Sequence, residues 1–537
     1  MKLKWKVNDI TGEKELERFN HIVLDINEKI ERALGFIDLE PSEGMFFNGY
    51  QTWTLSREYV RNDRMRGLNG MPEGVVKRYS LDGYSDYHFT RYPFKPGIFH
   101  GYSYCYFRDG DRYKLFASLD EKPGYTIFGY NVKKSRLKII RDAEGLIPDG
   151  EFHALDLFYM EGTEDEVFDA WFEALGIRPL SAPKIAGYSS WYNRYDYIDH
   201  ESIMEDLKGC KTILRRGDLF QVDDGWEPKV GDWEEADHGK FPEGMKSLAD
   251  EIHNAGFDAG LWMAPFAAAK GSRVLKEHPD WIIKDGEGKP FSCGCNWGGF
   301  YGLDIDIPEC LKYIEDSVKR AVSDWGFDLL KLDFLYAAAP FGNEKETRAG
   351  KMIRAMELIR SWVGDKRILA CGVPLMPAFG IADYSRIGCD VGLTWRDRPF
   401  LRLTHRERVS TVNSILDTIY RRQLDGRAFG NDPDVFFLRT ENLELTEREK
   451  DILATVNALL GSVFLTSDDP GKYDPAQRER YAYYRHLTEA ENVRIIKRER
   501  MGISYRLDGR AFGNDPDVFF LRTENLELTE RDRKSVV

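Results

Sequence analysis

The first third of the chain consists of short hydrophobic runs separated by turn signals. Residues 114–119, 125–130 and 136–140 are such runs, bounded by Asp-Gly, Lys-Pro-Gly and Ala-Glu-Gly sequences. Short runs flanked by glycine and proline are typical of β-strands joined by tight turns. Their regular spacing predicts an antiparallel β-sandwich, which we expect to form an N-terminal domain over residues 1–180.

A helix is expected to close this domain. Thr163 and Glu166 have the spacing of a capping box, in which each side chain bonds to the backbone of the other residue. Hydrophobic residues then recur at helical spacing over 167–175, and Gly176 supplies a stop signal. The following segment, 177–184, contains two prolines and is predicted to be a linker.

Beyond the linker, short hydrophobic strands alternate with amphipathic helices, including a helix expected around Arg348–Val363. This alternation predicts a central (β/α)8 TIM barrel over residues 181–475. The strand segments, in chain order, are IAGYSSW, DLFQVDDGW, FDAGLWMAPF, FDLLKLDFLY, RILACGVPL, YSRIGCDV, DVFFLR and GSVFLTSDD. All but DVFFLR carry polar or reactive residues at or just after the carboxyl end, where barrel enzymes build their active sites.

The last region, 476–537, is predicted to be an incomplete, truncated C-terminal β domain. Its end contains a repeat, because residues 424–448 recur letter for letter at 507–531. The first copy falls where the seventh barrel strand is due. The second copy cannot use the same place, so we expect it to pack poorly, to take no part in catalysis, and to pair its DVFFLR segment at 517–522 with an exposed strand. Complete identity indicates a recent duplication or a sequence-assembly error.

Composition limits the classes of partner. The chain has 537 residues and a formal net charge of −14, which disfavours nucleic acid and anionic membrane surfaces. No hydrophobic run is long enough to span a membrane, and the N-terminal sequence MKLKWKVNDI lacks the hydrophobic core of a signal peptide. Seven scattered cysteines fit a reducing compartment, so a cytoplasmic location is expected. Cys293 and Cys295 lack a second pair at zinc spacing, and neither a metal nor another cofactor is predicted.

Two carboxylates at strand ends suggest acid/base chemistry. Lys331 and Asp333 lie two residues apart on one strand, so both face the barrel mouth, and the cation favours an ionised Asp333. Asp390 follows a later strand, four residues after Arg386. Each pair could instead be a structural ion pair or a helix cap. Two carboxylates on one barrel rim are nevertheless the minimum machinery for glycoside hydrolysis.

Other polar and aromatic residues suggest a sugar site. Asp223 and Asp224 follow an early strand and could accept hydrogen bonds from sugar hydroxyls, although a cation site is the alternative. Trp191, Trp226 and Trp262 also follow barrel strands. One tryptophan alone would most often be a core residue, but three at the rim favour a wall on which sugar rings stack.

These segments resemble family 36 of the glycoside hydrolases, in particular its bacterial α-galactosidases, over roughly residues 40–475. The resemblance of KLDF and RIGCD implies that Asp333 is the nucleophile and Asp390 the general acid/base. DDGW, LWMAPF and ACGVPL resemble sugar-binding strands of the family. The resemblance places in the galactose pocket Asp223, Asp224, Trp262, Cys371, Lys331, Arg386 and Trp191, with Trp53 of the NGYQTW segment reaching over the barrel mouth from the N-terminal domain.

The activity implied is retaining, exo-acting hydrolysis of terminal α-D-galactosides, in oligosaccharides of the melibiose or raffinose type, through a covalent β-galactosyl-aspartate. Three alternatives stay open: a galactosyltransferase of the raffinose-synthase kind, an α-N-acetylgalactosaminidase, for which Cys371 would lie near the sugar 2-position, and a sugar-binding protein without catalysis. The resemblance also suggests a homo-oligomer. Spacing reveals neither an interface nor the natural oligosaccharide.

Overall fold

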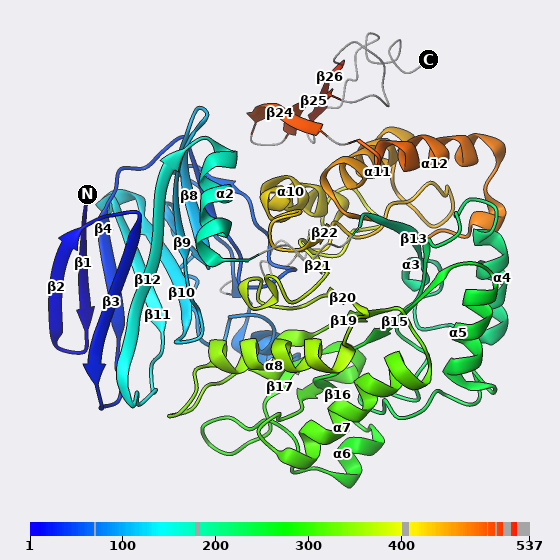
Figure 1. Cartoon of the computed structure of the whole chain (residues 1–537), viewed down its shortest axis with the longest axis horizontal. Coiled ribbons are helices and arrows are strands. Elements are labelled where there is room, and N and C mark those ends of the chain that lie inside the picture. The colour runs from blue at the N-terminus through cyan, green and yellow to red at the C-terminus, as the bar shows by residue number, and fades with distance from the viewer. Residues whose placement is uncertain are drawn as a thin grey trace.

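The computed structural model describes residues 1–68, 71–177, 183–399, 408–490, 492–499, 502–508 and 517–522. Figure 1 shows a pair of antiparallel sheets from the N-terminal part of the chain, a barrel built by the middle of the chain, and a small C-terminal sheet at the top. The architecture is therefore multidomain, with an N-terminal sandwich and a central barrel, as expected. The exact domain boundaries stay predictions.

Two six-stranded sheets form the sandwich, with strand orders β2-β1-β4-β11-β10-β7 and β3-β12-β9-β8-β5-β6. The three runs singled out in the sequence are the strands β9, β10 and β11 of these sheets. Alternate residues of β11 are buried, which is the pattern of a strand with one face on the core. The strands are β1 (Lys2–Val7), β2 (Ile10–Glu15), β3 (Phe19–Ile26), β4 (Ala33–Asp38), β5 (Gly44–Phe47), β6 (Glu58–Tyr59), β7 (Ile98–Tyr102), β8 (Tyr104–Asp109), β9 (Arg112–Ser118), β10 (Tyr125–Asn131), β11 (Arg136–Asp142) and β12 (Gly150–Gly162).

The predicted closing helix is α2 (Glu164–Leu175), and its capping signals are confirmed. Thr163 and Glu166 form the capping box, and Gly176 ends the helix with a φ of 65°, which glycine adopts without strain. Trp171 is fully buried and donates from Nε1 to the Ser118 carbonyl at 2.8 Å. This bond and the surrounding aromatic rings fix the helix to the sandwich.

Eight parallel strands form a nearly closed barrel in the order β22-β21-β20-β19-β15-β14-β13-β23. Most of their residues are buried, as expected for a sheet covered on both sides. The strands are β13 (Ile185–Ser189), β14 (Leu219–Val222), β15 (Asp258–Met263), β19 (Leu329–Leu332), β20 (Arg367–Ala370), β21 (Tyr384–Arg386), β22 (Gly430–Asp432) and β23 (Val463–Thr466). The helices of this region are α3 (Trp191–Arg194), α4 (His200–Cys210), α5 (Gly244–Asn254), α6 (Arg273–Glu277), α7 (Pro308–Lys319), α8 (Arg348–Val363), α10 (Thr411–Arg421), α11 (Glu447–Leu460) and α12 (Pro475–Leu487).

The prediction for the seventh strand is wrong. The strand is β22, and DVFFLR begins two residues after it ends. Pro433 has no N–H to donate to a ladder, and Asp434 has a φ of 73°, so the chain turns away from the sheet there. The barrel closes through Ser462, which donates its N–H to the Asn431 carbonyl at 2.9 Å, and through Phe436, which donates to Leu465 at 3.0 Å.

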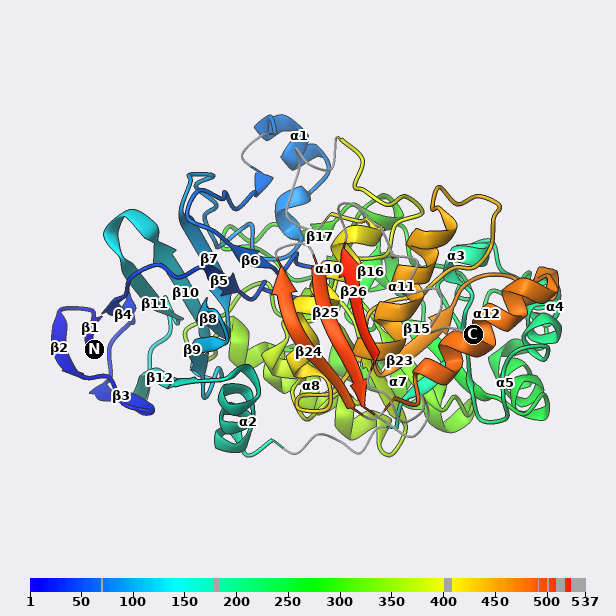
Figure 2. The same cartoon turned by 90° about the horizontal axis from the view of Figure 1, so that it is seen from above.

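An excursion from the sandwich reaches the barrel. Helix α1 (Glu73–Arg78) lies at the outer edge of the molecule in Figure 2, and the following turn at Leu81–Gly83 contacts β17 (Ser292–Gly294). A Cβ on Gly83 would lie 2.0 Å from the Ser292 carbonyl oxygen, so only glycine permits this approach. Strand β17 belongs to a small sheet, with β16 (Ala267–Ala269) and β18 (Phe300–Gly302), beside the barrel mouth.

The C-terminal sheet consists of β24 (Asn492–Glu499), β25 (Gly502–Asp508) and β26 (Asp517–Arg522), all antiparallel. The second DVFFLR segment is β26 and pairs with β25, as expected (Figure 2). The first DVFFLR segment, residues 434–439, forms no regular strand. Most of the remaining tail lies outside the described residues. The expectation that the tail packs poorly falls largely on those residues and stays a prediction.

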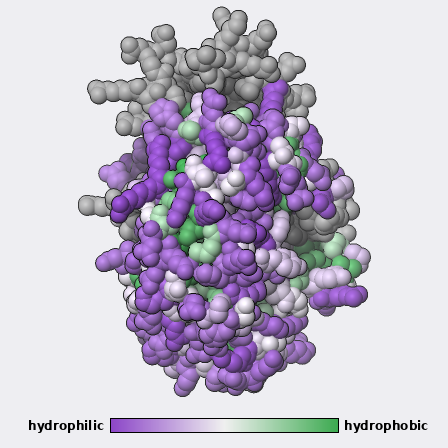
Figure 3. Space-filling model, turned by 90° about the vertical axis from the view of Figure 1, so that its right-hand side faces the viewer, coloured by the Kyte–Doolittle hydropathy of each residue, from purple (hydrophilic) through white to green (hydrophobic). Residues whose placement is uncertain are grey.

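The surface on the side of α4, α5 and α12 is mainly hydrophilic, with small hydrophobic patches (Figure 3). Among the residues that the structure describes, no helix combines the length and the apolar character needed to cross a bilayer.

Candidate active site

A cavity of about 310 Å³ lies at the carboxyl ends of the barrel strands. Its walls come from the barrel and from the N-terminal region, which contributes Gln51, Trp53, Leu81 and Tyr84. The predicted site residues that line it are Asp223, Asp224, Trp191, Trp262, Lys331, Asp333, Arg386, Asp390 and Trp53. Side chains more than 300 residues apart in sequence therefore meet in one pocket.

Asp333 directly follows β19 and is held by hydrogen bonds to both carboxylate oxygens. Trp262 donates from Nε1 to Oδ2 at 3.1 Å, and the Phe334 N–H donates to Oδ1 at 2.9 Å. The Asp333 N–H in turn donates to the Met263 carbonyl at 2.8 Å. Two donors and a fixed backbone orient a carboxylate that is 8% exposed, which suits a nucleophile.

Lys331 faces the same cavity, but its ion pair is with Asp223, at 2.8 Å, and not with Asp333. Burial opposes the charge of Lys331, yet the carboxylates of Asp223 and Asp333 raise its pKa above the usual value. The lysine is therefore a permanent cation at the floor of the site. Its positive charge interacts with the carboxylates of both Asp223 and Asp333.

Asp390 follows β21 and lies beside Arg386, whose Nη2 is 3.1 Å from Asp390 Oδ1. Nearly half of its side chain, 47%, is accessible from the cavity. The carboxyl nevertheless lies below the protein surface, and burial raises its pKa. The negative charges of Asp434 and Asp333 act in the same direction, while Arg386 and Lys331 oppose them. A carboxyl with a raised pKa can serve as a proton donor.

The acidic pair after β14 is held rigidly. Asp223 accepts hydrogen bonds from Gln221 Nε2 at 2.6 Å and from Lys331. Asp224 accepts one from Trp297 Nε1 at 2.9 Å, and burial raises its pKa. Both side chains line the cavity, where they can accept hydrogen bonds from ligand hydroxyls.

The aromatic wall differs from the prediction. Trp191 and Trp262 line the cavity, but Trp226 does not: it is fully buried and donates from Nε1 to the Trp262 carbonyl at 2.9 Å. Its ring packs on Trp233 and Trp325, so it supports the wall from behind and we do not retain it as a binding residue.

Trp53 reaches the cavity from the N-terminal region. Its Nε1 donates to the Cys371 sulfur at 3.1 Å, and its ring contacts Phe334, the neighbour of Asp333, with centroids 5.0 Å apart. Cys371, which the resemblance places in the pocket, is not among the residues that line the cavity: it is 1% exposed and contacts Trp53 instead. The structure thus places Trp53 in the wall, while its contact with a sugar stays a prediction.

The cavity lining also contains residues that the sequence does not predict, and Trp297 and Asp434 are the two that bear most on the chemistry of the site. Trp297 sits in the Asn296–Gly298 turn, where a φ of 54° aims it at Asp224. In the sequence, the adjoining Cys-x-Cys suggests only a metal motif. Asp434 also lines the cavity, whereas the hydrophobic pattern of its DVFFLR segment predicts a plain strand. Among the described residues, no group of three or more His, Cys, Asp or Glu side chains is arranged to hold a metal ion.

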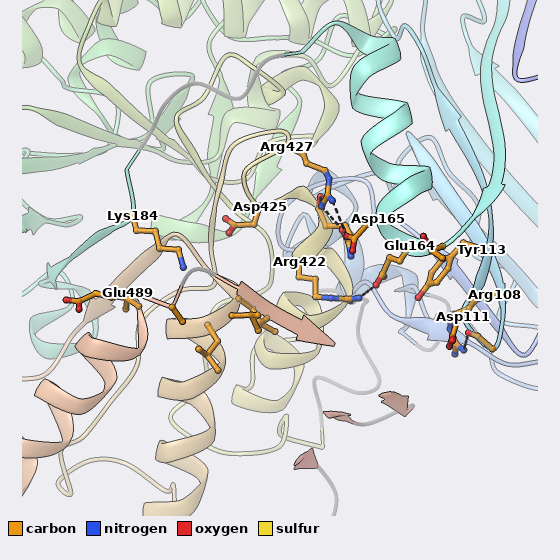
Figure 4. Close-up of a pocket in the computed structure, with 18 of the residues that line it drawn as sticks. Arg108, Asp111, Tyr113, Glu164, Asp165, Lys184, Arg422, Asp425, Arg427 and Glu489 are labelled. Atoms are coloured by element: carbon orange, nitrogen blue, oxygen red, sulfur yellow. Dashed lines mark hydrogen bonds and ion pairs between the residues drawn. The ribbon is translucent and has the colours of Figure 1, made fainter. Parts of the chain in front are cut away.

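A second cavity, of about 1000 Å³, lies between α2, the α10–β22 loop and β24 (Figure 4). It is larger, but many of its charged side chains neutralise one another. Arg422 pairs with Glu164, and Arg427 pairs with Asp165 at 3.1 Å. It also lies away from the carboxyl ends of the barrel strands. The smaller cavity is therefore the candidate active site.

A parallel barrel with two carboxylates and aromatic side chains lining one cavity at its carboxyl rim is an arrangement typical of glycoside hydrolases. The comparisons with known proteins narrow this class. Residues 189–357 match the Melibiase family model.

Curated relatives match only part of the chain. An A type blood α-D-galactosamine galactosaminidase from Flavonifractor plautii is 33% identical over 124 residues, which are 22% of this chain and 11% of that protein. The α-galactosidase Mel36A from Lactobacillus acidophilus is 29% identical over 135 residues, 23% of this chain and 18% of that protein. The match thus spans less than a fifth of the length of these relatives.

Solved structures match most of the chain. The α-galactosidase TtGalA from Thermus thermophilus, in complex with 4-nitrophenyl α-D-galactopyranoside, has a TM-score of 0.74 and 27% identity, covering 91% of this chain and 98% of that chain. The family 36 α-galactosidase AgaA from Geobacillus stearothermophilus has a TM-score of 0.58 at 14% identity, covering 92% and 68%, and shares the fold. The chain therefore contains a segment that matches the Melibiase model, and it shares its overall fold with these solved α-galactosidase structures.

Proposed function

We propose that the protein is a retaining, exo-acting α-galactosidase. The observation that carries this proposal is that Asp333 and Asp390, from different barrel strands, face one cavity of about 310 Å³ at the carboxyl rim. A cavity of this size suits one sugar unit and part of its aglycone. The substrates proposed are terminal α-galactosides of the melibiose and raffinose type, in line with the sugar complexes of the Thermus enzyme.

The reaction proposed is a double displacement. Asp333 attacks the anomeric carbon while Asp390 donates its proton to the leaving oxygen, so a β-galactosyl ester forms on Asp333 and the alcohol leaves. Asp390, now a carboxylate, takes a proton from water, whose oxygen attacks the ester carbon and releases α-galactose. The charge of Asp333 is lost during the first step, which lowers the pKa of Asp390 and favours its second role as base.

Specificity is proposed to rest on the acidic pair. Asp223 and Asp224 would accept hydrogen bonds from galactose hydroxyls, O4 and O6 by the family resemblance. A site built around a hydroxyl rejects analogues that place it elsewhere, because buried polar groups are then left unpaired. Trp53 closes the cavity from the N-terminal side, which favours single terminal sugars over internal cleavage.

One alternative has a specific observation behind it, since the Flavonifractor galactosaminidase is among the relatives. An N-acetylated or amino sugar needs room at the 2-position. By resemblance this position lies near Cys371, which is 1% exposed and accepts a hydrogen bond from Trp53 Nε1 at 3.1 Å. A thiol covered in this way supports an unsubstituted 2-hydroxyl. A transferase would share both carboxylates and differ at the acceptor side of the cavity.

The test is turnover of 4-nitrophenyl α-galactoside beside the α-glucoside and the α-N-acetylgalactosaminide. We expect the galactoside to be hydrolysed fastest, and α-galactose to be the first anomer seen by proton NMR. A retaining mechanism also requires Asp333 and Asp390 carboxyl groups about 5–6 Å apart. β-Galactose as first product would refute retention, and preference for the N-acetyl substrate would favour the alternative. If, at high acceptor concentration, galactosides of the acceptor formed in excess of free galactose, the protein would be a transferase.

A further inference from the structure

Asp434 occupies an unusual position beside the catalytic rim. Its φ of 73° is rare for a residue with a side chain, and such strain persists only where the surroundings hold it. The Asp434 N–H donates to Asp432 Oδ1 at 2.9 Å, and Asn457 Nδ2 donates to the Asp434 carbonyl at 2.9 Å. The backbone is therefore fixed on both sides, and the side chain lines the cavity.

One carboxylate oxygen of Asp434 contacts three groups of the site. Oδ2 accepts hydrogen bonds from the Val391 N–H at 2.8 Å and from the Tyr192 hydroxyl at 3.0 Å. It is also 3.1 Å from Nη2 of Arg386. Val391 directly follows Asp390, and Arg386 contacts Asp390 itself. Asp434 thus constrains the candidate acid/base in two ways: it binds the backbone amide next to Asp390, and it binds the arginine that pairs with the Asp390 carboxyl.

We propose that Asp434 is a positioning residue for Asp390: it fixes the Val391 amide and the Arg386 guanidinium, and its negative charge faces the same carboxyl. This inference rests on the proposed function of Asp390 as acid/base. Asp434 is 6% exposed and is not itself assigned a step in the reaction.

The geometry makes the electrostatic effect close-range. Asp390 Oδ1 and Asp434 Oδ2 each lie 3.1 Å from the same Arg386 nitrogen, so the two oxygens are at most about 6 Å apart. Asp434 competes for the guanidinium and repels a negative charge on Asp390, and both effects favour the protonated acid. The titratable and charged groups that interact with Asp390 are Arg386, Lys331, Asp333, Asp434, Tyr192, Cys371 and Cys389. Asp432 lies on the other side of Arg386, 3.9 Å from its Nε.

The test compares Asp434→Asn, Asp434→Glu and a matched control. Asparagine keeps the size and one acceptor oxygen but removes the charge. Two unit charges about 6 Å apart at an effective dielectric constant of about 20 interact by one to two pKa units. Asp390 must be protonated in the first step, so activity is lost as pH rises through its pKa. We expect Asp434→Asn to move the basic limb of kcat/KM about one pH unit lower and to reduce kcat about tenfold.

The repeat supplies the control. Asp517 occupies the same place in the second copy of the sequence, in β26, and Asp517→Asn should leave both values unchanged. Asp434→Glu keeps the charge and displaces it, so it should retain the wild-type basic limb while kcat falls. Comparison of Asp434→Asn with Asp434→Glu separates the effect of the charge from that of its position. Circular dichroism checks that each variant is folded.

A basic limb within 0.2 units of wild type and a kcat within about twofold for Asp434→Asn would overturn the proposal. So would an equal change in Asp517→Asn. If wild type turned over no α-galactoside, the proposed function would fail, but the inference could still be decided. The carboxyl of Asp390 can be titrated by infrared difference spectroscopy against Asp390→Asn, and removal of the Asp434 charge must lower its pKa.

Discussion

Arg421 joins the N-terminal domain to the barrel, and its replacement is expected to uncouple them. This arginine ends α10 and is fully buried. Its guanidinium donates to Asn48 Oδ1 at 2.9 Å, to the Thr52 carbonyl at 2.7 Å and to the Ile387 carbonyl at 2.8 Å. Two longer bonds reach the carbonyls of Gly49 and Gln51. One side chain thus binds the loop that carries Trp53 and the segment before Asp390.

The cost of removing it can be estimated from these bonds. Arg421→Met fills much of the same volume but leaves several buried carbonyls without a donor, and each unsatisfied buried group costs about 1–3 kcal/mol. The total is taken as about 3–5 kcal/mol, less than the sum over the five oxygens, because relaxation and water entry recover part of the loss. We expect the free energy of unfolding to fall by this amount, and kcat/KM to fall at least tenfold as Trp53 and Asp390 lose their support.

Urea unfolding followed by circular dichroism measures the first effect, and turnover of the nitrophenyl galactoside measures the second. Arg136→Met is a suitable control, since Arg136 is 48% exposed and makes one ion pair, with Asp38. Such exposed pairs contribute about 0–1 kcal/mol. If Arg421→Met unfolded within 1 kcal/mol of wild type and kept its activity, the domains would be held together by something other than this guanidinium.

Three further predictions concern the reaction and the tail. Asp333→Gly should lose about three or more orders of magnitude in rate, and azide should restore turnover and give a β-galactosyl azide; an α-azide would exclude Asp333 as nucleophile. Asp224→Asn should weaken discrimination between α-galactoside and α-glucoside, measured as the ratio of kcat/KM values, and an unchanged ratio would remove it from the specificity site. A chain ending at Arg506 should keep its activity, because among the described residues none that lines the cavity follows Asp434 in the sequence. Loss of activity with an intact circular dichroism spectrum would give the tail a structural role.

Local signals in the sequence were sufficient where the structure depends on local interactions. The ends of α2 follow from a capping box and a glycine that act within a few residues. Seven barrel strands follow from hydrophobic runs with polar residues at the carboxyl end. β22 gave no such signal: it is the three-residue segment Gly-Asn-Asp, and hydrogen bonds from its neighbours in the sheet define it. The more hydrophobic DVFFLR segment attracts the prediction, but Pro433 before it and the φ of 73° at its first residue, Asp434, interrupt the ladder.

Contacts between distant segments could not be read from spacing. KLDF places Lys331 and Asp333 on one side of a strand, yet the lysine pairs with Asp223, which lies 108 residues earlier. The burial of Trp226 depends on Trp233 and Trp325 behind it, and the direction of Trp297 depends on a left-handed turn. Such features are properties of the folded chain, and the sequence offers only the residue types.

The two copies of the repeat give the same peptide two backbone environments. The sequence AFGNDPDVFFLR occurs at residues 428–439 and again at 511–522, so an acid-active protease can release the same peptide from both copies after exchange is quenched. In the first copy, the amides of Leu438 and Arg439 donate to Asp468, at 2.6 and 3.0 Å, whereas 517–522 pairs with β25. Hydrogen exchange followed by mass spectrometry would therefore show two isotope envelopes for this peptide from a single pure protein. Such a pattern is usually assigned to a mixture of conformers, but here each envelope would come from one of the two copies in the same chain.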